Sequence, residues 1–187
     1  MKKLALAFLV LGILALSAAP TFASAILTDG SWHEFAFGGV GSFATGCGGT
    51  CIPTTDPVAE QTSTAPWTFS GAAVLTVQDL FLSVDRFQVF DNNVSLGDTS
   101  AETPGSDCGG DIGVCSSNAA LSKGAFSLGA GSHSITIQMV DSGQGGGAAV
   151  LRAVAATAAP EPSALLLLGL GLGLLASLAR KRIGNNN

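Results

Sequence analysis

The sequence predicts an all-β protein, an antiparallel β-sandwich of jelly-roll type flanked by an N-terminal signal peptide and a C-terminal transmembrane helix. Between residues 26 and 159, no window has the three-to-four-residue apolar period of an amphipathic helix. Several windows instead alternate apolar with polar residues and are rich in β-branched side chains. Glycine-rich turns separate these windows, which is typical of sandwiches with roughly six to eight short strands.

The exported domain is expected over residues 26–154, with strands separated by two long loops. We expect the first strand at 32–37, followed by a loop over 38–66 that is rich in Gly, Thr and Pro and should not pack. A second loop is expected over 97–122. The remaining strands are expected at 67–77, 80–90, 94–96, 132–139 and 148–154.

Alternation assigns faces to two of these strands. In the strand over 132–139, Ile135, Ile137 and Met139 should face the core, while Thr136 and Gln138 face solvent. In the strand that ends at residue 90, the side chains of 87 and 89 should face one way and those of 86, 88 and 90 the other. The Asp-Asn-Asn triplet at 91–93 tolerates a left-handed backbone and predicts a hairpin turn.

One short segment resembles a known fold family. Residues 128–135, Leu-Gly-Ala-Gly-Ser-His-Ser-Ile, are similar to the penultimate hairpin of galactose-binding-like carbohydrate modules. This resemblance implies a galactose-binding-like version of the jelly-roll sandwich.

The N-terminal segment has the features of a secretion signal. Lys2 and Lys3 precede an uncharged run over 4–16, and Ala23-Ser24-Ala25 has the small-x-small pattern that signal peptidase accepts. We therefore expect a signal peptide over 1–25, cleaved after Ala25. The alternative is an uncleaved anchor, but the apolar run is short for a bilayer core of about 30 Å, which needs roughly 20 residues.

The C-terminal segment combines a motif, an apolar run and a basic cluster. Pro160-Glu161-Pro162 is followed by an uncharged stretch over 163–179 and then by Arg180-Lys181-Arg182. We expect a transmembrane helix over 163–179, because its leucines favour hydrocarbon although its glycines weaken the helix. The basic cluster should stay in the cytoplasm, so the domain should lie outside. Residues 155–159 then form a linker of small residues.

This order of features resembles the sorting tail of the PEP-CTERM proteins of Gram-negative bacteria. The resemblance rests on Pro160 to Ser163, the leucine-glycine run and the basic cluster, and it extends over 160–187. It implies that an exosortase recognises the tail at the membrane and cuts near Pro-Glu-Pro. The protein would then reach the cell surface or the exopolysaccharide matrix. The alternative is a plain C-terminal anchor with a proline-rich spacer.

Charge excludes some partners of the exported domain. Residues 26–159 contain three basic residues, Arg86, Lys123 and Arg152, and twelve acidic residues, for a formal charge of −9. Such a surface repels nucleic acid and anionic lipid. We therefore expect no nucleic-acid partner.

Four cysteines predict disulfides in an oxidising compartment. They are Cys47, Cys51, Cys108 and Cys115. The sequence leaves three pairings open, although Cys47 with Cys51 and Cys108 with Cys115 could each close a short glycine-rich loop. The alternative is a metal site with four thiolates. It is disfavoured because three and six residues separate the cysteines and no histidine lies close by in sequence.

Motifs for catalysis are missing from the sequence. No serine stands in a Gly-x-Ser-x-Gly pattern. His33-Glu34 begins like a metalloprotease motif, but Phe37 occupies the position of the second ligand. Both His33 and His133 fit residues on strand faces, and exported cysteines are rarely kept as thiolates. We expect no catalytic residue, no cofactor and no enzymatic activity.

Acidic loop residues leave one metal hypothesis. Asp91 beside Asn92 and Asn93, or Asp107 with Asp111, could supply oxygen ligands to a structural calcium ion. The alternative is that these side chains cap their own turns, and no EF-hand spacing is present. These three aspartates are therefore weak calcium candidates.

The function predicted from these features is that of a non-enzymatic exported protein with a structural or adhesive role. The first alternative is a carbohydrate-binding module retained at the envelope, with exopolysaccharide as a partner. Such a module normally uses exposed aromatic rings, but tyrosine is absent, and Trp32 and Trp67 lie in apolar strand patterns that favour a core role. A secreted hydrolase is the second alternative.

Overall fold

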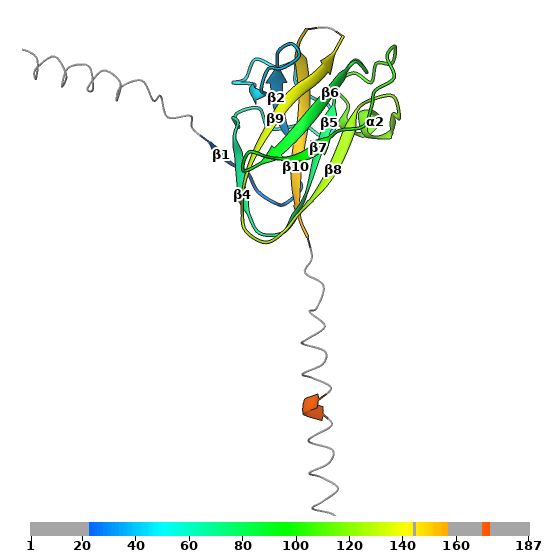
Figure 1. Ribbon diagram of the computed structural model, residues 1–187. Coiled ribbons are helices and arrows are strands. Elements are labelled where there is room, and N and C mark those ends of the chain that lie inside the picture. Colours follow the sequence, from blue (N-terminus) through cyan, green and yellow to red (C-terminus); the bar gives the residue numbers. More distant parts are fainter. Residues whose placement is uncertain (1–22, 144, 157–169, 173–187) are drawn as a thin grey trace, which may run out of the picture. The chain divides into compact units, whose positions relative to one another are not determined.

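The computed structural model describes residues 23–143, 145–156 and 170–172. Two sheets of five strands each make up the domain (Figure 1). The first sheet has the strand order β1-β4-β9-β6-β7 and the second has the order β3-β2-β10-β5-β8. The prediction of a mostly β domain is confirmed, and its strands form two sheets.

The strands have the following bounds. The first sheet contains β1 (Ser24–Ala25), β4 (Trp67–Ser70), β9 (Ser132–Ser142), β6 (Asp85–Asp91) and β7 (Val94–Asp98). The second sheet contains β3 (Thr45–Gly46), β2 (His33–Phe37), β10 (Gly147–Ala155), β5 (Ala73–Asp79) and β8 (Lys123–Leu128). A short helix, α2 (Ile112–Ser117), lies between β7 and β8. Neighbouring strands are antiparallel except β1 and β4, which are parallel.

The main core lies between the two sheets, because alternate residues of both sheets point inward. Phe35 of β2 contacts Phe87 of β6 edge to face, with ring centroids 5.7 Å apart. Trp67 of β4 is fully buried beside Phe35. The inward residues predicted for β9 are confirmed, because Ile135, Ile137 and Met139 are buried. The predicted alternation in β6 is also confirmed, and the structure shows that Phe87 and Val89 are on its buried face.

Two strand predictions need correction. The expected strand over 67–77 is two strands, because Gly71 adopts a φ of 96° between β4 and β5 and the chain passes from the first sheet to the second. The expected strand over 80–90 begins only at Asp85, since Phe81 has a φ of 62°. The predicted turn is confirmed, because Asn92 and Asn93 both have positive φ between β6 and β7.

The loop over 38–66 was expected not to pack, and this expectation is wrong. It contributes β3 to the second sheet, and Glu60 forms a bridge with His33. Its small side chains fit against the strands, which composition alone does not reveal. Ala59 joins a second apolar cluster with Trp32, Ile112 of α2 and Val150 of β10. This cluster covers the outer face of the second sheet.

Most of both predicted targeting segments lies outside the described residues. Of the predicted signal peptide, residues 23–25 are described, and Ser24–Ala25 forms β1. Of the predicted transmembrane helix, residues 170–172 are described and are helical. Within the described ranges, no helix is both long enough and apolar enough to cross a membrane.

Candidate functional sites

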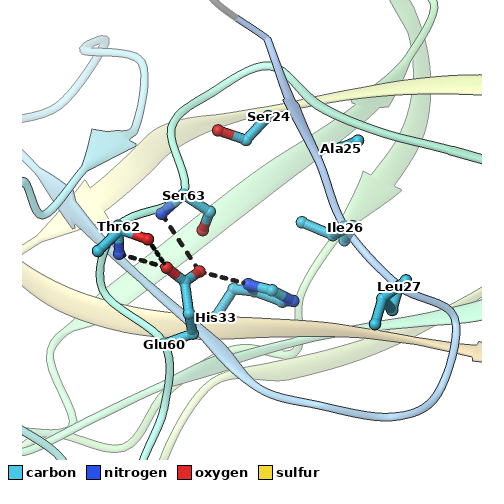
Figure 2. A pocket seen from close by; sticks show the side chains of 8 residues that line it. All are labelled: Ser24, Ala25, Ile26, Leu27, His33, Glu60, Thr62 and Ser63. Carbon is cyan, nitrogen blue, oxygen red and sulfur yellow. Dashed lines mark hydrogen bonds and ion pairs between the residues drawn. The ribbon is translucent and has the colours of Figure 1, made fainter.

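A cavity of about 300 Å³ lies beside β1 and contains one of the two histidines (Figure 2). The backbone positions its two ionisable groups. The Glu34 N–H donates to the Glu60 carbonyl at 2.8 Å, and the Glu60 N–H donates to the Trp32 carbonyl at 2.8 Å. Glu60 is thereby placed alongside His33. The cavity is lined by Ser24, Ala25, Ile26, Leu27, His33, Glu60, Thr62 and Ser63.

His33 and Glu60 form an ion-pair geometry in this cavity. His33 Nδ1 lies 2.8 Å from Glu60 Oε2. Partial burial opposes ionisation of Glu60, but hydrogen bonds from Thr62, His33 and Ser63 outweigh it and lower the pKa of Glu60 to about 2. Glu60 is therefore a carboxylate at neutral pH and orients the imidazole.

The other nitrogen of His33 lacks the partner that a hydrolase would need. His33 Nε2 is buried and has no hydrogen-bond partner, and it faces the side of Ile26 and Leu27 in Figure 2. Ser63 Oγ accepts the indole N–H of Trp67 at 3.2 Å. A nucleophile and its base must lie within hydrogen-bond reach. Across the described residues, no serine makes that contact with His33.

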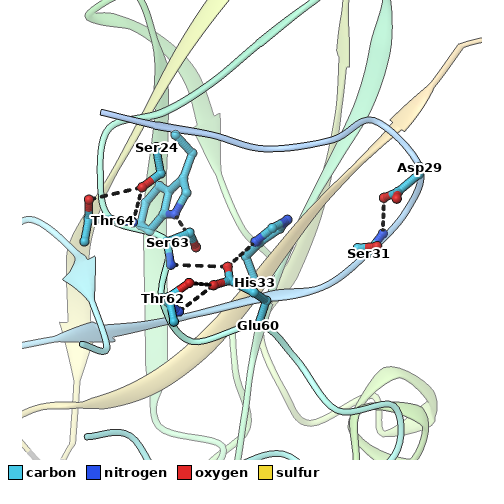
Figure 3. Close-up of polar contacts among 9 residues, drawn as sticks. Ser24, Asp29, Ser31, His33, Glu60, Thr62, Ser63 and Thr64 are labelled. Carbon is cyan, nitrogen blue, oxygen red and sulfur yellow. Dashed lines mark hydrogen bonds and ion pairs between the residues drawn. The ribbon is translucent and has the colours of Figure 1, made fainter. Parts of the chain in front are cut away.

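Ser24, which also lines the cavity, forms its side-chain hydrogen bonds with Thr64 and not with His33 (Figure 3). Its hydroxyl accepts the Thr64 N–H at 2.8 Å and lies 3.2 Å from the Thr64 hydroxyl. Its own N–H faces the carbonyls of Thr64 and Pro66 at 3.2 and 3.1 Å. Ser24 therefore fastens β1 to the segment that precedes β4.

The second histidine has both nitrogens occupied. His133 Nδ1 lies 2.8 Å from Asp91 Oδ2, and Nε2 lies 3.0 Å from the Gly129 carbonyl. Burial opposes the charged form, but the bonds to Asp91 and Gly129 outweigh it and raise the pKa of His133. The ring also packs against Phe69 at a centroid distance of 5.0 Å. His133 therefore lies on a strand face, as its sequence pattern predicted, and is held there by local contacts.

The cysteines form the two local disulfides. Cys47 bonds to Cys51 and Cys108 to Cys115, with S–S distances of 2.07 and 2.04 Å. Within the described part of the chain, one group of three potential ligand side chains lies within 4.8 Å, namely Glu34, Cys47 and Cys51. Disulfide sulfurs are not thiolate ligands, so the oxidised protein has no metal site there.

The three weak calcium candidates are occupied by local hydrogen bonds. Asp107 Oδ1 accepts the Gly109 N–H at 2.8 Å, and Asp111 Oδ1 accepts the Val114 N–H at 2.8 Å and caps α2. Asp91 accepts the Ser134 N–H at 3.0 Å in addition to its contact with His133. These contacts are the turn and capping roles that formed the alternative to calcium. Calcium at these positions stays a prediction.

The tryptophans do not form a sugar platform. Trp67 is 0% exposed, and Trp32 is buried beneath the guanidinium of Arg152, which lies 4.4 Å from the ring centroid. The exposed aromatic surface is elsewhere. Phe43 is 54% exposed, and its ring lies 6.2 Å from that of Phe90 on the outer face of the first sheet. Alternation had assigned Phe90 to that face, but Phe43 lay in the loop that was expected not to pack.

The comparison with family models concerns the C-terminal segment. The model described as the PEP-CTERM protein-sorting motif matches residues 158–182. The chain carries a PEP-CTERM sorting motif. This motif indicates an exported, envelope-associated protein that an exosortase sorts. Comparisons with curated proteins and with solved structures found no match.

The PEP-CTERM match contains every predicted sorting residue. Pro160, Glu161 and Pro162 lie near its start, and Arg180, Lys181 and Arg182 lie at its end. All six lie outside the described residues. The last strand, β10, ends at Ala155, so the motif begins directly after the domain's final strand.

Proposed function

We propose that this PEP-CTERM protein is a non-enzymatic, structural or adhesive component of the cell surface or exopolysaccharide matrix, where a jelly-roll sandwich is its exported domain. The observation that carries the proposal is the sorting motif at 158–182, which directly follows a β domain with two local disulfides. Signal peptidase and exosortase are its processing partners. The C-terminal segment holds it in the membrane before processing.

Strand order supports the jelly-roll assignment. Setting aside the two-residue strands β1 and β3, each sheet has four strands, in the orders β4-β9-β6-β7 and β2-β10-β5-β8. The chain passes from one sheet to the other at most steps, and the last two strands, β9 and β10, lie inside different sheets. Such crossing connections are typical of jelly rolls.

Site geometry supports a non-enzymatic role. His33 has an orienting carboxylate but no nucleophile in hydrogen-bond reach among the described residues, and both nitrogens of His133 are bonded. Each histidine lies on a different sheet with its own acidic partner. A hydrolase would require these groups to converge on one reacting atom.

The test of sorting replaces Pro160, Glu161 and Pro162 together with alanine in the full chain. In a host with an exosortase, we expect wild type to reach the surface or matrix in a shortened form. The triple variant should stay full-length at its C-terminus and remain with the membrane. Thr157→Ser, which lies just before the match, is the control and should be processed like wild type. Normal processing of the triple variant would contradict the proposal.

Carbohydrate binding is the second candidate function, and Phe43 and Phe90 favour it. Their rings lie on the outer face of the first sheet, near Gln88 and Gln138, which pair with each other across β6 and β9. An aromatic face can pack on the apolar face of a sugar ring, and amides can bond its hydroxyls. Because the domain is acidic, a neutral exopolysaccharide fits better than an anionic one.

Affinity electrophoresis in gels that contain host exopolysaccharide tests this second function. We expect the protein to be retarded and Phe43→Ala to reduce the retardation several-fold. Val58→Ala is a matched control, because Val58 is 73% exposed in the loop that follows Cys51. Trp67→Ala is unsuitable, since it would open a cavity in the core. Equal retardation of wild type and Phe43→Ala would reject this surface.

A further inference from the structure

One of the two disulfides lies beside a buried glutamate. Glu34 is on β2, and the antiparallel pairing of Phe35 with Gly46 brings Cys47, one residue further along, alongside Glu34. A carboxylate oxygen of Glu34 and the sulfurs of Cys47 and Cys51 all lie within 4.8 Å of one another. The carboxyl group and the disulfide therefore form one cluster, whose position is fixed by the second sheet.

Glu34 is buried and keeps one oxygen without a partner. The residue is 0% exposed, and its cross-strand partner in β10 is the fully buried Val150. Glu34 Oε2 accepts the side-chain N–H of Gln61 at 2.7 Å, whereas Oε1 is buried and has no hydrogen-bond partner. Burial raises the pKa of Glu34, and the bond from Gln61 only opposes this effect. Glu34 therefore holds a proton more readily than an exposed glutamate does.

The two sulfurs differ in how a molecule from solvent can reach them. Cys47 is 2% exposed, whereas Cys51 is partly exposed. Cys51 lines a cavity of about 380 Å³, together with Ile52, Phe81 and Ala148. Because thiol–disulfide exchange depends on which sulfur is accessible, an incoming thiolate attacks Cys51 and Cys47 is the leaving group.

The other disulfide has neither of these features. Cys108 and Cys115 are 8% and 0% exposed and belong to the apolar cluster around Trp32. In the described part of the chain, Cys47 and Cys51 are the cysteines that share a three-group cluster with an acidic side chain. They are also only 4 positions apart, so their bond restricts the unfolded chain little and its opening costs the domain little stability.

We propose that the Cys47–Cys51 disulfide is an exchange site at which a thiol of another exported polypeptide attaches covalently to this protein. The partner's thiolate attacks the Cys51 sulfur and forms a mixed disulfide, while the bond to Cys47 breaks and Cys47 leaves as a thiolate. The Glu34 carboxyl gives its proton to Cys47, directly or through one water, and becomes a carboxylate. One disulfide replaces another, so no oxidant or reductant is consumed.

The surroundings of Cys51 indicate the class of thiol. The apolar side chains of Ile52 and Phe81 favour a cysteine flanked by apolar residues, and the formal charge of −9 over residues 26–159 disfavours an anionic thiol. The exchange is reversible, because the Cys47 thiol can attack the mixed disulfide and restore the resting form. Only the identity of the partner rests on the proposed adhesive role. Exchange and sorting are measured separately, so either can fail alone.

The test exposes the oxidised full chain to mercaptoethanol at neutral pH, followed by acid quenching, alkylation of free thiols and peptide mapping. We expect Cys47–Cys51 to open at least about tenfold faster than Cys108–Cys115 in the same molecules. The added thiol should be on Cys51 and the new free thiol on Cys47. Equal opening rates for the two disulfides, or addition to Cys47, would overturn the proposal.

Glu34→Gln tests the proton donor, because it removes the acidic proton but keeps the side-chain shape and an oxygen acceptor for Gln61. It should slow the opening of Cys47–Cys51 several-fold and leave the other disulfide unchanged. Asp98→Asn removes an exposed carboxylate on β7 and is the matched control, which should react like wild type. An unchanged or faster opening of Cys47–Cys51 in Glu34→Gln would contradict the role of the carboxyl group.

A second thiol tests the apolar partner. A neutral peptide with leucines on both sides of its cysteine should react several-fold more slowly with Ile52→Ser than with wild type. The rate with mercaptoethanol should not change, since this small thiol has no apolar residues to pack on Ile52. An equal effect on both thiols, or none on the peptide, would contradict the apolar partner.

Discussion

At the residue scale, each of the two histidines has a carboxylate at Nδ1, but the two differ in what contacts Nε2. Glu60 holds Nδ1 of His33 and leaves the buried Nε2 without a partner beside the cavity. Asp91 holds Nδ1 of His133, while the Gly129 carbonyl takes the other nitrogen. His133 is thus held by two contacts near the start of β9. In His33, by contrast, Nε2 is still without a hydrogen-bond partner.

A residue-scale prediction concerns the pH dependence of folding. Because the folded state raises the pKa of His133, the stabilisation is fully present below its ordinary value of 6.5 and is lost as the pH rises through the higher folded value. We expect His133→Gln to lower the free energy of unfolding by about 1–3 kcal/mol near pH 5.5, and by less near pH 8.5. Denaturant unfolding at both pH values measures this.

Asp91→Asn supplies the matched comparison for this prediction, because it keeps the shape of the acceptor but removes its charge. It should remove most of the same pH-dependent difference. A loss of stability in His133→Gln that is equal at the two pH values would contradict the prediction, because it would show that the charge of the imidazole contributes nothing beyond packing on Phe69 and neutral hydrogen bonds.

At the element scale, β1 lies at the end of the predicted signal peptide and pairs with the folded domain. Ser24 pairs with Trp67 and Ala25 with Thr68 in the parallel β1–β4 contact. A cut after Ala25, as the sequence predicts, would remove this strand but leave the bond from the Ile26 N–H to the Thr68 carbonyl at 2.9 Å. The position of the cut therefore decides whether the mature domain keeps β1.

The corresponding prediction compares two forms of the exported domain, one beginning at Ser24 and one at Ile26. The longer form keeps the bonds of Ser24 with Thr64 and Pro66 and should be more stable by about 1–2 kcal/mol. Urea unfolding monitored by tryptophan fluorescence measures the difference. Ser24→Ala in the longer form separates the hydroxyl's part from that of the backbone. Identical midpoints would mean that β1 contributes nothing to stability.

Much of the fold could be predicted from the sequence where one face of a strand is buried. The alternation in β9 identified Ile135, Ile137 and Met139 as core residues, because a period of two places all its large apolar side chains on one face. In β6 the alternation separated the two faces but did not say which one is buried, since Phe90 lies opposite Phe87. The Asn turn could be predicted from its tolerance of positive φ. The strand β8 was missed, since at the edge of its sheet it has few large apolar residues.

The candidate sites could be predicted less well, because they depend on contacts between distant segments. Glu60 meets His33 across 27 residues, and its loop has no periodic pattern. In the sequence, Asp79 and Asp85 look like ordinary residues at the ends of strands. Only the folded structure shows that each has a buried carboxylate oxygen without a hydrogen-bond partner. The local disulfides were one of three open pairings, and the packed loops selected them.

At the scale of the whole molecule, the chain joins a sorting segment to an acidic β-sandwich with one covered and one open outer face. The second sheet is covered by α2 and the apolar cluster around Trp32. The first sheet exposes Phe43 beside Phe90. This asymmetry makes the first sheet the face to examine for contacts in the envelope, and the PEP-CTERM motif explains how the domain would arrive there.

Intact mass spectrometry of the protein isolated from its host envelope tests this central claim most directly. We predict a chain that lacks the N-terminal segment up to Ala25, contains its four cysteines as two disulfides and ends near Pro160–Pro162. The same spectrum would reveal any group attached at the new C-terminus. A mature protein that still ends at Asn187 would contradict the account of sorting and processing.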